Sequence, residues 1–135
     1  FGTSGYPATR RVIDVSGDGP NNSGGLVTIM RDRLVAAGVV INGLPIMVKV
    51  SSVNNQFDVA HLDEYFVDCV IGGPGAFMIP IKAKDEFLPA TRRKLLLEIA
   101  GLEPPARLIH AQTTAEAPQV DCTIGERLRN SWPRN

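Results

Sequence analysis

Apolar residues along the chain fall into two patterns, short continuous runs and runs with helical spacing. The continuous runs predict buried strands, and they cover residues 10–17, 39–42 and 76–81. The runs with helical spacing predict helices, and they cover residues 26–37, 59–67 and 84–100. Strands that alternate with helices are typical of a parallel sheet with helices packed on it. The pattern therefore predicts an α/β fold with a doubly wound, mostly parallel sheet.

The helices at 26–37 and 84–100 each have an apolar stripe. Ser23 is the predicted N-cap of the first helix, and Gly38 closes it. The charged residues 31–33 are predicted to form its solvated face. The apolar positions of the first helix are Leu26, Ile29, Met30, Leu34 and Ala37. In the second helix, the predicted buried stripe is Leu88, Leu95, Leu96 and Ile99.

Glycine and proline mark the connections between these elements. Residues 43–45 are predicted to bend the chain out of the second strand, and residues 46–50 either extend that strand or add an edge. Residues 71–75 predict a rigid turn before the third strand. After residue 101 the chain becomes looser and richer in proline. We therefore expect a globular part at 1–101 and an extension at 102–135 that wraps the surface or is partly disordered.

Composition and charge narrow the classes of partner. The 135 residues are 44% hydrophobic, which is enough for one core. The 14 basic and 14 acidic residues balance, so the chain has no electrostatic attraction for nucleic acid or for an acidic membrane. No run of about 20 apolar residues is present, so we expect no transmembrane segment. No signal peptide is visible in the chain.

The end of the first predicted strand carries the candidate chemistry. Asp14, Ser16 and Asp18 are spaced by two, which places three oxygen side chains on one side of an extended chain. A carboxylate in an apolar strand is costly unless it is paired or bound to a cation. Such hard ligands suit Mg²⁺ or Ca²⁺, and the neighbouring candidates for binding are Gly19, Asn21 and Asn22. The same loop is also consistent with ordinary turn chemistry, and both interpretations stay open.

Other familiar sites do not fit. An EF-hand that began at Asp14 would have Gly25 where a bidentate Glu is needed. A phosphate loop is disfavoured because Asn22 stands where its third glycine should be and Asp18 repels the anion. His61 and Cys69 have no orienting partner or oxyanion motif, so they do not predict a nucleophile pair. The cysteines and histidines lack the paired spacing of a zinc site.

Four motifs carry a family resemblance. They are RRVIDVSGDGPNN from Arg10, VINGLPI from Val40, CVIGGPGAF from Cys69 and RRKLLLEIAG from Arg92. Together they resemble an uncharacterised bacterial family of von Willebrand factor A-like domain proteins, over roughly residues 8 to 101. The resemblance implies a Rossmann-like sheet in the order 3-2-1-4-5-6, with metal or ligand at the carboxyl ends of the strands where the order reverses.

The resemblance also implies which part of the fold is present. Asp18 and Gly19 match the motif after the fourth strand, with Gly17 where a Thr is usual. Residues 1–101 would then be the C-terminal half of the domain, and the D-x-S-x-S strand and the Thr loop would lie upstream of Phe1. The first strand would have an unpaired edge, so the expected partner is another protein chain or the missing N-terminal half.

The function implied is a non-enzymatic protein–protein interaction module. In it, a divalent cation at Asp18, helped by Asp14 and Ser16, forms a metal-ion-dependent adhesion site that bridges to an acidic residue of the partner. One alternative is a structural subunit of a larger assembly with a degenerate, metal-free site. Another is a metal-dependent hydrolase, which is disfavoured because no general base or water-activating site is visible.

The family resemblance further implies a periplasmic or secreted protein. In that setting Cys69 and Cys122 are candidates for one disulfide, which would join the extension to the globular part. Free thiols are the alternative.

Overall fold

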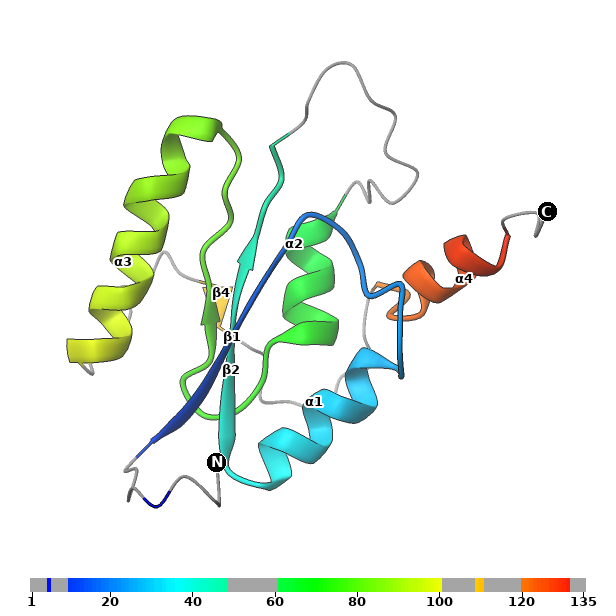
Figure 1. Cartoon of the computed structure of the whole chain (residues 1–135), viewed down its shortest axis with the longest axis horizontal. Helices are drawn as coiled ribbons and strands as arrows, with labels where there is room; N and C mark the ends of the chain where they lie inside the picture. The colour runs from blue at the N-terminus through cyan, green and yellow to red at the C-terminus, as the bar shows by residue number, and fades with distance from the viewer. Residues whose placement is uncertain (1–4, 6–9, 49–60, 101–108, 111–119, 132–135) are drawn as a thin grey trace.

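The computed structural model describes residues 5, 10–48, 61–100, 109–110 and 120–131 (Figure 1). Its sheet contains β1 (Arg11–Gly17), β2 (Val39–Pro45), β3 (Phe77–Met78) and β4 (Ile109–His110), in that order. The helices are α1 (Val27–Ala36), α2 (Leu62–Tyr65), α3 (Phe87–Ala100) and α4 (Ile124–Asn130). A π-helical turn, η1 (Phe66–Val70), continues α2, and a 3₁₀ turn, η2 (Lys84–Glu86), precedes α3.

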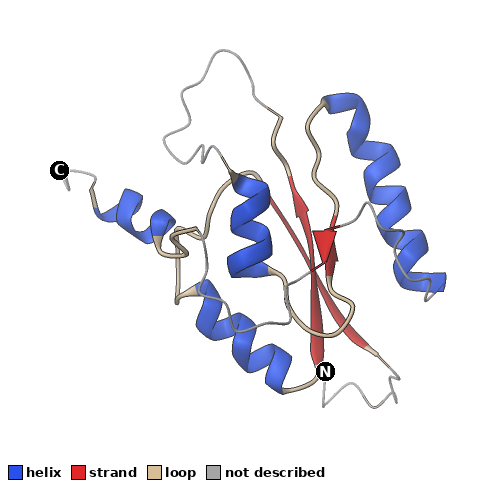
Figure 2. Cartoon of the chain, turned by 180° about the vertical axis from the view of Figure 1, so that it is seen from behind, coloured by secondary structure: helices blue, strands red, loops and turns tan. Residues whose placement is uncertain are grey.

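The strands and helices form three layers. β1, β2 and β3 are parallel, and β4 is antiparallel to β3. Because the three parallel strands lie in sequence order, α1 and α2 cross over on the same face of the sheet, and α3 covers the other face (Figures 1 and 2). The predicted α/β fold with a mostly parallel sheet is confirmed.

β2 is the central strand, and all seven of its residues are buried. Gly43 is required there because a Cβ at this position would lie 2.7 Å from the ring of Phe66 and 2.9 Å from Ile71. The predicted bend at 43–45 is wrong, since the strand continues to Pro45, opposite Gly17. Ile46 then forms a single bridge with Ile81, while residues 49–50 lie outside the described part.

Two apolar clusters fill the space on either side of the sheet. The cluster beneath α3 consists of Leu44, Phe77, Ile79, Ile81, Ala90 and Leu97. The cluster beneath α2 and η1 consists of Leu62, Tyr65, Phe66, Cys69, Val70, Ile71 and Met78. The sheet is therefore covered on both faces, as expected for parallel strands.

β1 differs from the prediction of a strand buried on both faces. None of its seven residues is buried: Arg11, Asp14 and Ser16 are exposed, and the other four are half-buried. The reason is its position, because β1 pairs with β2 on one side only and forms the end of the described sheet. Figure 1 looks onto this edge, and Figure 2 looks onto the opposite edge at β4.

α1 begins and ends close to the predicted bounds, but it buries less than expected. Ser23 does not cap it: Leu26 occupies the N-cap position, and no side chain caps this end. Gly38 closes the helix with a positive φ of 74°, as predicted. No residue of α1 is buried. Arg31 was predicted to be fully solvated, but it is half-buried because its side chain donates to the carbonyl of Asp68 at 2.6 Å.

The buried stripe predicted for α3 is wrong. Its buried residues are Ala90, Lys94 and Leu97, whereas all four predicted core residues are exposed. These four are Leu88 (77% exposed), Leu95 (47%), Leu96 (55%) and Ile99 (84%). The carboxylate of Glu86 accepts the backbone N–H groups of Lys82 and Ala83, which fixes the start of the helix.

Several other bounds shift. The helix predicted at 59–67 begins at Leu62 and continues through η1 to Val70, and residues 59–60 lie outside the described part. The third strand is shorter than residues 76–81. Of the extension at 102–135, the described residues contribute β4 and α4. Within the described residues, no helix combines the length and apolarity needed to cross a bilayer.

Candidate interaction site

The open side of β1 presents backbone groups that the described residues do not pair. The carbonyl of Gly17 accepts the N–H of Ile46, so this residue directs its backbone groups toward the β2 side. Backbone direction alternates along a strand, so the N–H and C=O groups of Val12, Asp14 and Ser16 point toward the open edge. Such a row of free donors and acceptors is a template for another strand.

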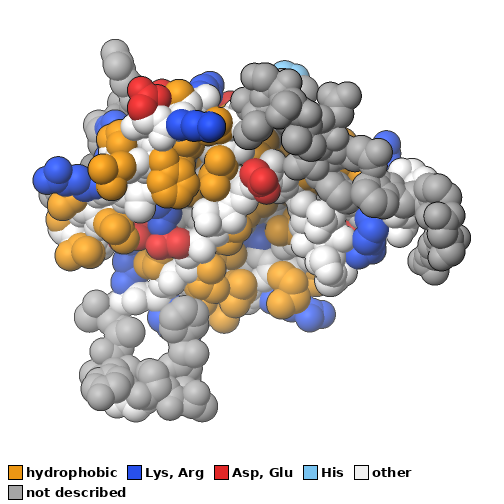
Figure 3. Space-filling view, turned by 45° about the horizontal axis from the view of Figure 1, so that its top comes forward, with side chains coloured by type: hydrophobic (Ala, Val, Ile, Leu, Met, Phe, Trp, Pro, Cys, Tyr) orange, Lys and Arg blue, Asp and Glu red, His pale blue; other side chains and the backbone are white. Residues whose placement is uncertain are grey.

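The helices on either side of this edge expose large apolar side chains. At α1 these are Leu26, Ile29 and Met30, which are 39%, 47% and 50% exposed. At α3, Leu88, Leu95 and Ile99 form one stripe by helical spacing. Figure 3 shows apolar side chains gathered over a broad part of one face, with acidic and basic groups between them. A large exposed apolar patch on a folded protein usually marks a site where another molecule binds.

A polar network joins β1, β2 and α3. The ammonium group of Lys94 is paired with Asp14 and, at 2.8 Å, with Glu98. Glu98 also accepts the side-chain N–H of Asn42 at 2.8 Å, and the oxygen of Asn42 accepts the N–H of Phe77 at 3.1 Å. Asp14 and Asn42 are register partners on adjacent strands, so the network crosses the sheet on the α3 face.

This network explains the charge of Asp14 without a metal. The carboxylate lies against the ammonium group of Lys94, which would repel a divalent cation at the same oxygen. Ser16 shares the α3 side by strand alternation, Asp18 follows the strand in a bend, and both are exposed. Among the described residues, no group of three or more His, Cys, Asp or Glu side chains could hold a metal. A Mg²⁺ or Ca²⁺ site at Asp18 therefore stays a prediction that needs ligands from elsewhere.

The helix α4 packs against the loop after β1. The side-chain N–H of Asn21 donates to Glu126 at 2.6 Å and to the carbonyl of Gly25 at 3.0 Å. Arg129 donates to the carbonyl of Asn22 at 3.0 Å. A Cβ at Gly125 would lie 2.0 Å from the carbonyl oxygen of Asn21, so only glycine allows this close approach. The binding candidates Asn21 and Asn22 thus hold α4 in place, whereas Gly19 makes no such contact with the described residues.

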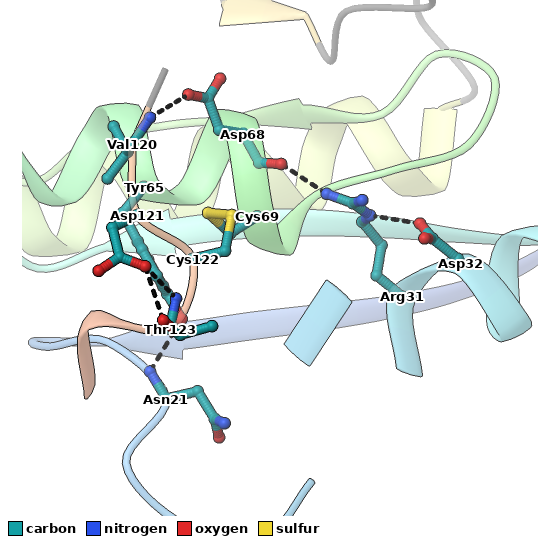
Figure 4. Close-up of a disulfide and its surroundings, with 10 residues drawn as sticks. All are labelled: Asn21, Arg31, Asp32, Tyr65, Asp68, Cys69, Val120, Asp121, Cys122 and Thr123. Atoms are coloured by element: carbon teal, nitrogen blue, oxygen red, sulfur yellow. Dashed lines mark hydrogen bonds and ion pairs between the residues drawn. A yellow bond between two sulfur atoms is a disulfide. The ribbon is translucent and has the colours of Figure 1, made fainter. Parts of the chain in front are cut away.

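Cys69 and Cys122 form a disulfide, which confirms the predicted pairing (Figure 4). Cys69 is fully buried in η1, and the backbone N–H of Val120 donates to the carboxylate of Asp68 at 3.1 Å beside it. The bridge joins residues 53 apart in the sequence and attaches the start of α4 to the α2 side. It also explains why Cys69 and His61 form no nucleophile pair: the thiol is consumed, and His61 is exposed next to Glu64.

Tyr65 connects the disulfide region to the loop after β1. Its hydroxyl accepts the backbone N–H of Asn21 at 3.1 Å. Burial raises the pKa of Tyr65, the bond from Asn21 opposes this shift, and the charges of Glu126 and Asp121 add to it. The hydroxyl therefore stays protonated at neutral pH. One oxygen of Glu126 nearby is buried without a hydrogen-bond partner among the described residues.

Asp121 organises the residues before α4. Its carboxylate accepts the backbone N–H of Thr123 at 2.9 Å and the hydroxyl of the same residue at 2.7 Å, and it is paired with Arg127. These contacts, the Thr123 hydroxyl first, lower the pKa of Asp121. The carboxylate is therefore charged at neutral pH and fixes the turn that starts the helix.

The sequence alone did not identify the residues that form hydrogen bonds and ion pairs with the predicted site residues. Lys94, Glu98 and Asn42 were not singled out, although a polar residue within the apolar run at 39–42 was a visible signal. Lys94 and Glu98 also have the i, i+4 spacing of a helical ion pair. Tyr65 and Glu126 had no comparable signal, because their contacts with Asn21 span 44 and 105 residues.

Comparison with known proteins identifies a family but no relative with an assigned role. No curated protein and no solved structure matches the chain. One family model matches residues 1–103, which is most of the chain. The chain belongs to the family described as "Protein of unknown function (DUF1194)".

Proposed function

We propose that the chain is a non-enzymatic protein-interaction module whose sheet is completed by a strand from another polypeptide segment. The observation that carries this proposal is β1, an edge strand with outward backbone groups that lies between helices with exposed apolar residues. A strand added to such an edge gains backbone hydrogen bonds, and the helices that accompany it would cover the exposed apolar residues of α1 and α3. The described residues supply no other cover for this surface.

The proposed partner is the complementary half of a von Willebrand factor A-like domain. Its strand would run parallel to β1, and its helices would pack on the exposed apolar residues of α1 and α3. Parallel sheets are normally covered by helices on both faces, and this arrangement would give β1 the environment that β2 already has. The disulfide supports a periplasmic or secreted setting for the assembly, because disulfides persist in oxidising compartments.

Strand addition can be tested with a library of displayed peptides of seven residues, the length of β1. The Ser16→Pro variant removes an N–H that points toward the open edge and leaves the β2 ladder intact. Its matched control, Ser16→Ala, keeps the N–H. We expect the native chain and the control to bind extended apolar peptides, and the proline variant to bind them about tenfold more weakly or less. Equal binding by both variants would rule out this edge as the docking surface.

A second candidate function adds a divalent cation at Asp18. Asp18 is exposed at the carboxyl end of β1, next to the open edge, where an added strand could bring further oxygen ligands. In this case Mg²⁺ or Ca²⁺ would strengthen binding of the complementary half, and Asp18→Ala would remove the effect. Binding that is equal with and without a chelator would instead support a structural subunit with a metal-free site.

A further inference from the structure

We propose that the strand which completes the sheet carries a Lys or Arg that faces α3 beside Asp14. This inference rests on the proposed function, and it specifies the chemistry of the partner strand. It follows from the charge of the network formed by Asp14, Lys94 and Glu98, and from the unequal burial of the two carboxylates.

The network has an excess of negative charge. One ammonium group, that of Lys94, is shared by two carboxylates. Among the described residues, neither Asp14 nor Glu98 has a second basic partner. The trio therefore retains one negative charge that no described side chain compensates.

The excess charge is located at the open edge. The side chain of Glu98 is 13% exposed and accepts a further hydrogen bond from Asn42. The side chain of Asp14 is 43% exposed, so water still solvates it. Lys94, at 6% exposure, is held between the two. Asp14 is thus the member of the trio that depends on solvent.

A partner strand would remove that solvent. Adjacent strands lie about 4.8 Å apart, so a side chain opposite Asp14 on the α3 face would displace its water. A carboxylate that loses water without gaining a partner is strongly disfavoured. A basic side chain at this position would replace the water at the Asp14 carboxylate and neutralise the trio. Opposite charges on neighbouring strands also attract.

The neighbouring positions define the rest of the pattern. On the opposite face of β1 lie Ile13 and Val15, which are apolar and half-buried. A matching strand needs apolar residues there. The α3-facing positions near Val12 and Ser16 require no charge. The partner strand is therefore expected to alternate, with apolar residues on the α1 side and one central basic residue on the α3 side.

The peptide selection that tests the proposed function also tests this inference. We expect Lys or Arg to be enriched at one central position on the native chain, and replacement of that residue by Ala to weaken binding about fivefold or more. Replacement by Glu should weaken binding further. Asp14→Asn keeps the shape of the side chain and removes its charge, so it should reduce the preference for a basic residue to less than about twofold. Asp32→Asn, an exposed carboxylate of α1, should leave the preference unchanged.

The outcomes separate the two proposals. Peptides that bind the native chain without a basic preference, or with a preference that persists in Asp14→Asn, overturn the inference and leave strand addition in place. Equal binding by Ser16→Pro and Ser16→Ala overturns the proposed function itself. If no peptide binds the native chain, both fail. Circular dichroism of each variant shows whether the fold is retained, and sedimentation shows whether a second copy of the chain occupies the edge instead.

Discussion

β1 and β2 have similar sequences, RVIDVSG and VVINGLP, and lie side by side, yet every residue of β2 is buried and none of β1 is. β2 has a strand on each side, whereas β1 has one on a single side among the described residues. The difference shows that the burial of a strand is decided by its neighbours as much as by its own apolar content. β1 has the composition of an interior strand in the position of an edge strand.

The same contrast extends to the helices. The region of α2, η1, the disulfide and α4, which we call the closed side, has a dense core around fully buried aromatic rings. At the open edge, by contrast, α1 has no buried residue. The closed side buries its large apolar residues within the described part of the chain. The open edge retains surface that the proposed partner would cover.

Phe66 and Phe87 give the largest expected contrast. Phe66 is 2% exposed on the closed side, and Phe87 is 48% exposed at the start of α3. Phe66→Ala should lower the free energy of unfolding by about 3–5 kcal/mol, because it empties a packed site. Phe87→Ala should lower it by about 1 kcal/mol or less. Denaturant unfolding of the two variants measures both values, and similar losses would contradict the division into a closed side and an open edge.

Removal of the disulfide should weaken the closed side more than the sheet edge. In the double variant Cys69→Ala and Cys122→Ala, the free energy of unfolding should fall by about 2–4 kcal/mol, because a bridge across 53 residues no longer restricts the unfolded chain. Hydrogen exchange should become faster in α4 and at the N–H of Asn21, which α4 and Tyr65 hold in place. Exchange in β1 and β2 should change less. Faster exchange in β1 than in α4 would show that the disulfide supports the sheet edge instead.

The sequence predicted the positions of the strands and helices better than it predicted which helix face is buried. Apolar runs and helical spacing depend on neighbours along the chain, and they located the three parallel strands and the helices between them. The choice between two apolar stripes on α3 depends on the sheet it meets. There Asp14 and Asn42 favour Lys94 and Glu98 as facing residues, so Leu95 and Ile99 point away. Periodicity alone could not decide this.

The candidate site was predicted in part for a similar reason. The acidic residues at the end of β1 are visible in the sequence, and the cost of a charge in an apolar strand correctly indicated a partner for Asp14. That the partner is a lysine 80 positions away is a property of the folded chain. The contact between Asn21 and Glu126 spans 105 residues and is equally invisible in local patterns.

The smallest expected effect concerns Tyr65, and it tests how well the closed side excludes water from this side chain. Tyr65→Phe removes one hydrogen bond, from the N–H of Asn21, and should lower the free energy of unfolding by about 1 kcal/mol. Because burial raises the pKa of Tyr65 in the folded chain, the stability that depends on its protonated hydroxyl is complete below about pH 10 and is lost as the pH rises further.

Absorbance titration of the phenolate resolves this directly, because the chain contains only two tyrosines, Tyr6 and Tyr65. We expect one of them to titrate above the ordinary range, and Tyr65→Phe to abolish that transition and leave the other. The alkaline loss of stability should also be shallower in the variant. If both tyrosines titrate in the ordinary range, water reaches the ring that α4 and the loop after β1 are meant to cover, and the closed side would then be as open to solvent as the edge at β1.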